Sequence, residues 1–455
     1  MKTDSSATVA VILAAGKGTR MKSARAKALA PLCGQPLVNY PIKAAREAGI
    51  ERVVLVVGHQ ADTVRAAVGD GVEYALQQPQ NGTGHALMCA EETLRGFTGT
   101  ILVHCVDVPL LPAADLAALL QVHTEAGNAA TVMTTIKAEP GNYGRVVRDA
   151  AGNVARIVEA RDADDAVKAI HEINGGTYCF QAPLIFAMLH QLTPNNAQGE
   201  YYLTDVLELL IKHGEKVGAV VSPDEHLVDG INDRVQLSEA EATLRQNINL
   251  AHMRNGVTIV DPKSTFIDEG VLIGQDTIIH PFTFIYAGTV IGNDCIIGPG
   301  SQLFATTVED NAQVISSRVE QSIIRTGGKV GPFSRLRANC EIATGAEVGN
   351  FSEMKNTRVG AGSKVHHLGY LGDTTLGEKV NIGAGTITCN YDGAKKHKTT
   401  MGDNVFIGSG SLIVAPINIG DRALTGAGSV VTRDIPSGKV AFGVPAKIVR
   451  DRESS

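Results

Sequence analysis

An apolar residue followed by glycine recurs at intervals of six residues, or multiples of six, in the second half of the chain. These pairs stand at 273–274, 291–292 and 297–298, at 330–331 and 348–349, at 376–377 and 382–383, and at 401–402, 407–408 and 419–420. A period of six is typical of a parallel β-helix, in which apolar residues point into a narrow interior and glycine permits tight corners. The phase slips between the four groups, where we expect inserted loops. An irregular, glycine-rich β-sandwich is the alternative, but sandwiches do not keep a six-residue phase.

The first half of the chain has a different rhythm, in which short apolar runs alternate with helical patterns. The expected strands are Val9–Leu13, Val53–Val57, Ile101–Val108 and Ala129–Ile136, and the expected helices include Leu37–Ala48 and Ala113–Ala126. Fully apolar strands between helices indicate a mostly parallel, Rossmann-like α/β sheet that is covered on both faces. Such sheets bind ligands beyond the carboxyl ends of their strands.

The domain organisation follows from these two rhythms. A chain of 455 residues is too long for one ordinary core and suggests two or three domains. Residues 229–252 read as one helix with few breakers. We therefore expect an α/β domain over residues 1–228, a helical linker over 229–252 and a β-helix over 253–455.

Charge and cysteine content exclude several classes of protein. The formal net charge of −6 gives no indication of nucleic-acid binding. The seven cysteines form no CxxC pair and are odd in number, which favours free thiols in a reducing compartment. The N-terminal apolar stretch soon runs into Gly, Lys and Arg, so we expect no signal peptide, and no other run is long enough for membrane insertion. We expect a cytoplasmic protein.

A glycine-rich loop directly follows the first expected strand, with the sequence Leu13-Ala-Ala-Gly-Lys-Gly-Thr-Arg-Met21. Its small residues let backbone N–H groups approach a phosphate or a base edge, and Lys17 and Arg20 add positive charge. Met21 excludes a dinucleotide fingerprint, and the Ser or Thr that a Walker A loop needs is missing. A bare GxG is as often a structural strand–helix turn; the longer string is more specific.

Asp107 ends an apolar strand in Val106-Asp107-Val108-Pro109-Leu110. A carboxylate at that place can hold Mg²⁺ against a triphosphate, because Mg²⁺ binds few protein ligands and keeps phosphate oxygens. Taken alone, such an aspartate is as often a helix N-cap or a turn residue.

With these strings, the first half resembles the nucleotidyltransferases that make nucleoside-diphosphate sugars. The match continues through Lys27, Gln77, Gly82-Thr83-Gly84-His85-Ala86, Tyr143-Gly144-Arg145, Glu159, Asn174, Gly199–Asp205 and Gly230–Arg234. The resemblance implies that nucleotide and sugar are bound by Leu13, Ala14, Ala15, Gly16, Arg20, Lys27, Gln77, Gly82, Thr83, Gly144, Glu159, Asn174 and Asn232. It also implies Mg²⁺ as cofactor, held by Asp107 and Asn232.

Two segments of the second half break the six-residue rhythm and are expected to carry function, because the coil itself needs no insertion. One is Lys355–Asp373, which contains His366 and His367; the other begins at Thr386 and includes a basic run over 395–398. Histidine is the usual group for removing a proton from an attacking amine, although a lone histidine is more often structural. Neighbours on a strand point to opposite faces, so only one of the two histidines can enter a given site.

Asn350–Lys355 and Asn381–Gly393 extend the resemblance over nearly the whole chain. The chain resembles a bacterial family of bifunctional enzymes that join an N-acetylglucosamine-1-phosphate uridyltransferase to a left-handed β-helix glucosamine-1-phosphate acetyltransferase. The resemblance implies a homotrimer that uses glucosamine 1-phosphate, acetyl-CoA and UTP to make UDP-N-acetylglucosamine, a precursor of peptidoglycan and lipopolysaccharide. It assigns His367 as general base; Arg337, Lys355, Tyr370 and Asn381 to the sugar phosphate; and Ala384, Asn390, Tyr391, Ser409 and Ala427 to acetyl-CoA, with Asn390 and Tyr391 also beside the sugar.

The sequence departs from that family at a few positions. Ala26 stands for a Pro, Val106 and His366 for Gly, and Val444 for an Arg that contacts CoA. His366 therefore remains a rival to His367. Two other interpretations stay open: a transferase for another sugar 1-phosphate whose β-helix is a scaffold, and a binding protein with a degenerate first site. The set of Lys355, His367, Asn390 and Tyr391 argues against the scaffold, and intact Lys27 and Asp107 argue against the binding protein.

Overall fold

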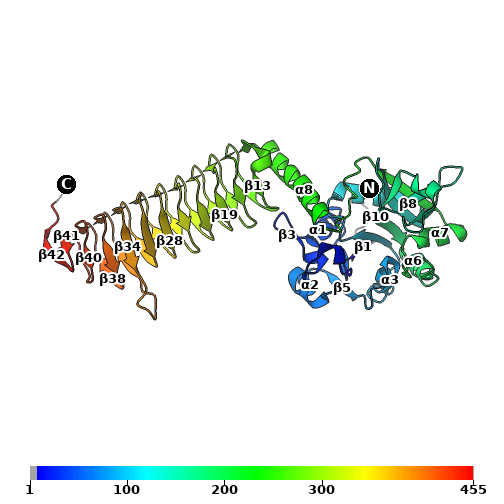
Figure 1. Cartoon of the computed structure of the whole chain (residues 1–455), viewed down its shortest axis with the longest axis horizontal. Helices are drawn as coiled ribbons and strands as arrows, with labels where there is room; N and C mark the ends of the chain where they lie inside the picture. The colour runs from blue at the N-terminus through cyan, green and yellow to red at the C-terminus, as the bar shows by residue number, and fades with distance from the viewer. Residues whose placement is uncertain (1–7, 454–455) are drawn as a thin grey trace. The chain divides into compact units, whose positions relative to one another are not determined.

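The computed structural model describes residues 8–453 (Figure 1). The first seven residues, over which we expect no signal peptide, and the last two lie outside the described residues. The chain divides into two compact units within helix α8 (Arg234–Arg254), between Ala242 and Thr243. This helix begins later than the predicted residue 229, because the Asp233 side chain accepts hydrogen bonds from the backbone N–H groups of Val235 and Gln236, both 2.9 Å long, and so caps it. No helix of the described residues is both long and apolar enough to cross a membrane.

The first unit is built on one sheet. In spatial order its strands are β11 (Val217–Ser222), β7 (Ala130–Ile136), β10 (Glu172–Gln181), β6 (Thr100–Cys105), β1 (Thr8–Leu13), β4 (Arg52–Val57) and β5 (Glu73–Leu76). Neighbours are parallel except at β10, which runs antiparallel to β6 and β7. The hairpin of β8 (Arg145–Arg148) and β9 (Val154–Val158) pairs with β10. The mostly parallel sheet confirms the predicted fold class of this half.

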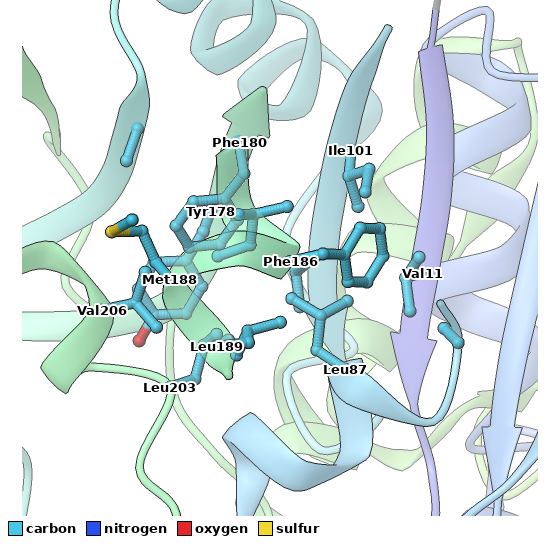
Figure 2. Packing of buried hydrophobic residues seen from close by; sticks show 14 of the residues in the cluster. Val11, Leu87, Ile101, Tyr178, Phe180, Phe186, Met188, Leu189, Leu203 and Val206 are labelled. Carbon is cyan, nitrogen blue, oxygen red and sulfur yellow. The ribbon is translucent and has the colours of Figure 1, made fainter. Parts of the chain in front are cut away.

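Helices cover both faces of this sheet. Helices α1 (Asn39–Glu47), α2 (Ala61–Val68) and α4 (Ala113–Glu125) contribute to the buried cluster on one face, and α3 (Thr83–Met88), α6 (Ala182–Leu189) and α7 (Asp205–Lys212) to the cluster on the other. The short α5 (Asp165–Lys168) buries no side chain. Val9 and Val11 of β1 belong to one buried cluster, whereas Ala10 and Ile12 belong to the other. Figure 2 shows the first cluster, where Val11 lies near Leu87 of α3 and Phe186 of α6. A strand buried on both faces explains why the sequence of β1 is continuously apolar.

The second unit is a parallel β-helix with three faces, whose strands stack one above the next along its axis (Figure 1). The first face includes β15 (Ile278–Ile279), β18 (Ile296–Ile297), β21 (Gln313–Val314), β24 (Lys329–Val330), β27 (Glu347–Val348), β30 (Lys364–Val365), β33 (Asn381–Ile382), β36 (Phe406–Ile407) and β39 (Leu424–Thr425). The second face includes β25 (Arg335–Leu336), β28 (Ser352–Lys355), β31 (Gly369–Gly372), β34 (Thr386–Cys389), β37 (Leu412–Val414) and β40 (Val430–Val431). The third includes β29 (Arg358–Val359), β32 (Thr374–Leu376), β35 (Thr399–Met401) and β38 (Ile417–Ile419). A hairpin of β41 (Lys439–Gly443) and β42 (Ala446–Asp451) closes the stack.

The turns of the helix differ in length, and this corrects the expected origin of the phase slips. Strands of the first face begin at residues 278, 296, 313, 329, 347, 364, 381, 406 and 424, so successive turns contain 18, 17, 16, 18, 17, 17, 25 and 18 residues. The first two slips therefore arise from turns that are one or two residues short. Only the third slip comes from an inserted loop, over 390–398, which projects from the stack in Figure 1.

The segment Lys355–Asp373 does not break the coil, so that expectation was wrong. Its strands pair in register with the turns before and after, as in Glu347 with Lys364 and Met354 with Leu371. Val365 and Leu371 are about 1% exposed and fill the interior, so the corner between them can carry histidines without disturbing the stack.

Candidate functional site

A pocket of about 480 Å³ opens at the carboxyl ends of β1, β5 and β6. Nine of the residues predicted to bind nucleotide or metal line it: Leu13, Ala14, Ala15, Gly16, Lys27, Gln77, Gly82, Thr83 and Asp107. The lining is completed by Lys17, Ala28, Gln80, Ala86, Cys105, Val106 and Glu200. The pocket therefore lies at the edge of the sheet where ligands of parallel sheets are expected.

The glycine-rich loop reaches the pocket through a tight turn at Gly18. Gly18 has a φ of +58°, and a Cβ there would lie 2.7 Å from Cβ of Lys27. The loop can thus pass beside Lys27 only with glycine at this position. Arg20 follows in a short 3₁₀ turn, Thr19–Met21.

Four predicted residues converge beside the pocket, which Lys27 and Asp107 line and Arg20 and Asn232 do not. Lys27 donates from Nζ to Oδ2 of Asp107 at 2.7 Å and to Oδ1 of Asn232 at 3.1 Å. Arg20 donates from Nη2 to the same Asn232 oxygen at 2.9 Å. Asp107 lies in the turn beyond β6, which ends at Cys105 and not at the predicted Val108. The carbonyl of Asp107 accepts the backbone N–H of Ile231 at 2.8 Å, and this bond joins the two segments that carry Asp107 and Asn232.

The donor set fits a hard divalent cation. One carboxylate oxygen and one amide oxygen both accept from the Lys27 ammonium, and the amide oxygen also accepts from Arg20. Oxygens of these kinds are the ligands that Mg²⁺ prefers. Among residues 8–453 no cluster of three or more His, Cys, Asp or Glu side chains could hold a metal. A site with two protein ligands suits Mg²⁺ because phosphates and waters supply the others.

The predicted sugar-binding residues Gly144, Glu159 and Asn174 lie together, although none is part of the pocket lining. A Cβ on Gly144 would be 3.4 Å from Oε1 of Glu159 and 3.6 Å from Cβ of Asn174, so glycine keeps this space open. The Glu159 carboxylate accepts a hydrogen bond from Oγ1 of Thr204 at 3.3 Å. Burial raises the pKa of Glu159, and the Thr204 bond partly offsets this.

Several pocket residues escaped the sequence analysis. Gln80 lines the pocket and donates from Nε2 to the carbonyl of Gln77 at 3.2 Å. Glu200 and Cys105 also line the pocket. Glu200 stands inside a string that the resemblance included, but no spacing rule marked Gln80 or Cys105, because their position depends on where β5 and β6 end.

In the β-helix, His367 heads a column of small residues. Lys364 pairs with Asn381, Asn381 with Phe406 and Phe406 with Leu424. Three residues after each of these come His367, Ala384, Ser409 and Ala427, which therefore occupy equivalent places in successive turns. Three of the five residues predicted for acetyl-CoA, Ala384, Ser409 and Ala427, thus follow the predicted base in a line of small side chains.

The two adjacent histidines have different surroundings. His366 is half-buried, and its Nε2 lies 2.7 Å from Oε2 of Glu347, whose other oxygen accepts from Nζ of Lys329 at 3.2 Å. These two contacts lower the pKa of Glu347. His367 is exposed, and its ring meets the His366 ring edge-on at 6.2 Å. Within residues 8–453 no hydrogen bond or ion pair reaches the His367 ring. Both histidines lie in the corner between β30 and β31, not on a strand as expected, so strand alternation cannot decide which of them enters a site. Their different partners distinguish them instead.

The residues predicted to hold the sugar phosphate fall on two faces. Arg337 directly follows β25, and Lys355 is the last residue of β28, so both lie on the second face. Arg337 donates from Nη1 to Oε1 of Glu353 at 3.2 Å. Tyr370 lies in β31 of that face, and a Cβ on Gly372 would meet both its hydroxyl and Nδ2 of Asn390, at 2.5 and 2.6 Å. Asn381 lies on the first face, in β33. The corner that bears His367 separates the two groups.

The inserted loop over 390–398 brings further charge to the second face. Asn390 is buried and donates from Nδ2 to Asp373 at 2.5 Å, while Tyr391 is 61% exposed. Asp392 folds the loop by accepting the backbone N–H groups of Ala394 and Lys395 and by lying 2.6 Å from Nε2 of His397. The loop sets Lys396 beside Lys355, and together with Arg337 this lowers the pKa of Lys355. A group of like charges held together is suited to an anion.

Family models match both halves of the chain. The model described as Nucleotidyl transferase matches residues 9–229. The models described as Bacterial transferase hexapeptide (six repeats) and Hexapeptide repeat of succinyl-transferase match residues 270–305 and 398–433. The hexapeptide matches and the three-faced stack confirm the predicted left-handed β-helix.

Proteins named Bifunctional protein GlmU match nearly the whole chain. The protein from Heliobacterium modesticaldum is 48% identical over 95% of this chain and 94% of its own length. That from Pelobacter propionicus is 46% identical over 97% of both. A solved structure, a putative glucose-1-phosphate thymidylyltransferase from Bacillus anthracis, is 20% identical, covers 52% of this chain and 95% of its own, and has a TM-score of 0.44. The full-length similarity confirms the family expected from the sequence: the chain belongs to the GlmU family of bifunctional transferases.

Proposed function

We propose that the chain acetylates glucosamine 1-phosphate with acetyl-CoA in its β-helix and then transfers a uridyl group from UTP to N-acetylglucosamine 1-phosphate in its α/β unit. The observation that carries this proposal is the presence of two distinct sites in one chain. One is a pocket whose lysine, carboxylate and amide suit a metal-bound triphosphate. The other is an exposed histidine whose ring makes no hydrogen bond or ion pair within residues 8–453, at the head of a column of small residues. A scaffold would need neither His367 nor the neighbouring cations.

In uridyl transfer, the phosphate of the sugar attacks the α-phosphorus of UTP in line. A new P–O bond forms, and the bond to the leaving pyrophosphate breaks. Lys27 and Arg20 counter the negative charge that grows on the phosphate oxygens, and the loop Leu13–Gly16 supplies backbone N–H groups. Gly144, Glu159 and Asn174 orient the sugar. Asp107 and Asn232 would hold Mg²⁺, which supplies charge neutralisation at the phosphates when bound.

In acetyl transfer, His367 removes a proton from the amine of glucosamine 1-phosphate. The amine nitrogen then forms a bond to the thioester carbonyl carbon, the C–S bond breaks, and the CoA sulfur leaves and takes up a proton. Arg337, Lys355 and Lys396 bind the sugar phosphate. Ala384, Ser409 and Ala427 leave room for the pantetheine arm, because none of them carries a large side chain.

The active assembly is a homotrimer. The edge between the first and second faces is convex, so Asn381 on one face and Lys355 on the other cannot enclose a substrate in a single chain. A second chain seated against this edge would complete the site. We place the enzyme in the cytoplasm, which fits its seven free cysteines and its use of UTP and acetyl-CoA.

The direct test is to incubate the protein with glucosamine 1-phosphate, acetyl-CoA, UTP and Mg²⁺ and to identify the products by mass spectrometry. UDP-N-acetylglucosamine, CoA and pyrophosphate are expected. Uridyl transfer without acetyl transfer would favour the scaffold interpretation, and neither product would contradict the proposal.

The Asp107→Ala variant assigns the first site. Uridyl transfer should fall about a hundredfold or more, because one charge-stabilising group is lost, while acetyl transfer persists. Uridyl transfer at the parental rate would refute the role of Asp107.

A further inference from the structure

The side chain of Gln77 lies at the floor of the nucleotide pocket in a fixed orientation. Gln77 is only 3% exposed. Its backbone N–H donates to the carbonyl of Val57 at 2.8 Å, and its own carbonyl accepts from Nε2 of Gln80 at 3.2 Å. The main chain is therefore held on both sides, and the remaining freedom is the direction of the side-chain amide.

Two acceptors surround the amide nitrogen of Gln77. Nε2 lies 2.9 Å from the carbonyl oxygen of Gly82 and 3.2 Å from Nδ1 of His85. A backbone carbonyl can only accept a hydrogen bond, so the nitrogen and not the oxygen must face Gly82. If His85 Nδ1 takes the second amide hydrogen, both hydrogens are used within the protein.

The other ring nitrogen of His85 is placed to support this arrangement. Nε2 of His85 lies 3.8 Å from Sγ of Cys89, one helical turn further along, and sulfur is a weak acceptor. Burial raises the pKa of the Cys89 thiol, which keeps the sulfur uncharged. A proton on Nε2 that points to sulfur leaves Nδ1 free to accept from Gln77. His85 itself does not line the pocket, so it cannot act by touching a nucleotide.

The consequence is that Gln77 offers only its carbonyl oxygen to a ligand. Uracil carries an N–H donor at position 3, whereas cytosine carries a bare acceptor nitrogen there. A buried acceptor facing a second acceptor costs far more than a mismatch in apolar contact, because neither group can find a partner. Turning the amide over to suit cytosine would set its oxygen against Gly82 O, and it would also require the His85 proton to move from Nε2 to Nδ1.

We propose that His85 is a specificity-determining positioning residue, which selects uracil over cytosine nucleotides by holding the Gln77 amide with its oxygen toward the base. With His85 absent, the reversed amide is opposed by Gly82 O alone, and no proton has to move on a neighbouring ring. The inference rests on the proposed uridyl transfer.

The test compares kcat/KM for UTP and for CTP in pyrophosphate release with N-acetylglucosamine 1-phosphate. His85→Leu removes the acceptor with little change in bulk, and it should lower the UTP-to-CTP ratio about tenfold. His85→Asn can place its amide oxygen near the position of Nδ1 and should keep the ratio within about threefold of the parent. His190→Leu, on the surface of the same unit at 2.9 Å from Glu91, is the matched control and should leave the ratio unchanged.

Several outcomes would overturn the inference. An unchanged ratio in His85→Leu, or UTP and CTP rates that fall together, would show a structural role only. An equal loss of discrimination in His85→Asn would show that ring shape matters and not the acceptor. If His85→Leu turns over too slowly, competition binding of UTP and CTP without sugar measures the discrimination between the two nucleotides as a ratio of affinities. Parent enzyme that releases no pyrophosphate from any nucleotide would instead contradict the proposed function.

Discussion

At the scale of single residues, the contacts around a side chain decide which chemistry is open to it. Nε2 of His366 lies 2.7 Å from Oε2 of Glu347, and Glu347 also pairs with Lys329. The exposed His367 ring has no such partner in the described part of the chain and can accept a proton from a bound amine. Lys27 illustrates the reverse case, since its ammonium is shared by Asp107 and Asn232 until a ligand competes for it.

The difference between the histidines predicts different effects of their removal. His367→Ala should lower acetyl transfer by roughly a hundred- to ten-thousandfold, the usual contribution of a positioned base, and leave uridyl transfer intact. His366→Ala should keep most of the acetyl transfer, because only the pair with Glu347 is lost. Both rates are measured on the same preparations, by CoA release and by pyrophosphate release. If His366→Ala loses acetyl transfer and His367→Ala keeps it, His366 is the base and the assignment to His367 is wrong.

His104 predicts a pH dependence of stability. This histidine is 1% exposed in β6, its Nδ1 lies 2.8 Å from Oγ1 of Thr177, and burial lowers its pKa from 6.5 to about 4. Between pH 6.5 and 4 the unfolded chain binds more protons at this residue than the folded chain, so stability falls as the pH drops. The loss at pH 5 relative to pH 7 should be about 2 kcal/mol.

Urea unfolding of the parent and His104→Gln at pH 7 and pH 5 measures this effect. The difference between the two proteins should shrink by about that amount at the lower pH. The comparison removes other groups such as Asp205, whose pKa is raised to about 6 by burial and which acts in the opposite direction. The exposed substitution His190→Gln is the control. A parallel pH dependence in parent and His104→Gln would contradict the assignment.

At the scale of elements, the β-helix shows what a sequence pattern can and cannot specify. The six-residue period predicts the stack because interior Val and Ile positions must align. The period does not reveal that turns contain 16, 17 or 18 residues, since a corner can lose a residue while the interior residues stay in line. For the same reason, the six-residue period does not distinguish the histidine corner from an insertion.

The candidate sites were predictable to a similar extent. The apolar runs mark the end of β1 correctly and the end of β6 to within three residues, so the pocket loop and Asp107 could be placed near this edge of the sheet from the sequence. The bond between Lys27 and Asp107 joins residues 80 positions apart, and the pair of His366 and Glu347 depends on the register between turns. Neither contact follows from local spacing.

The close approach of successive turns predicts which glycines are irreplaceable. A Cβ on Gly349 would lie 2.2 Å from the carbonyl oxygen of His366, a backbone atom that cannot move without distorting the next turn. Gly349→Ala should therefore cost about 2–3 kcal/mol and also weaken acetyl transfer. Gly345 has a φ of +63° and open space around it. Asparagine tolerates this conformation, so Gly345→Asn should lower the free energy of unfolding by less than about 1 kcal/mol. Thermal unfolding of the parent and the two variants measures these losses of stability, and equal losses in the two variants would contradict the prediction.

At the scale of the whole molecule, one edge of the β-helix is apolar where a soluble surface should be polar. Phe333 and Phe351 stack at 5.5 Å and are 59% and 58% exposed, and Leu368, next to His367, is 64% exposed. They follow one another in successive turns at the same corner, as the bonds from Phe351 N to Phe333 O and from Gly369 N to Phe351 O show. A row of large apolar side chains along an edge marks a contact with another protein chain, and the proposed trimer supplies that contact.

The trimer leads to a prediction that separates assembly from folding. Leu368→Asp places a charge in the contact and should convert the protein to monomers, because a carboxylate cannot be buried there without a partner. Acetyl transfer should fall at least tenfold, since each site then lacks the neighbouring chain, whereas uridyl transfer should stay near the parental rate because its pocket is formed within one chain. Leu272→Asp makes the same change at another exposed apolar residue, 63% exposed in β14 (Leu272–Ile273), and should leave both properties unchanged. Light scattering gives the assembly state of each variant. A stable monomer with full acetyltransferase activity would show that one chain completes the site, and the convex edge would then need a different explanation.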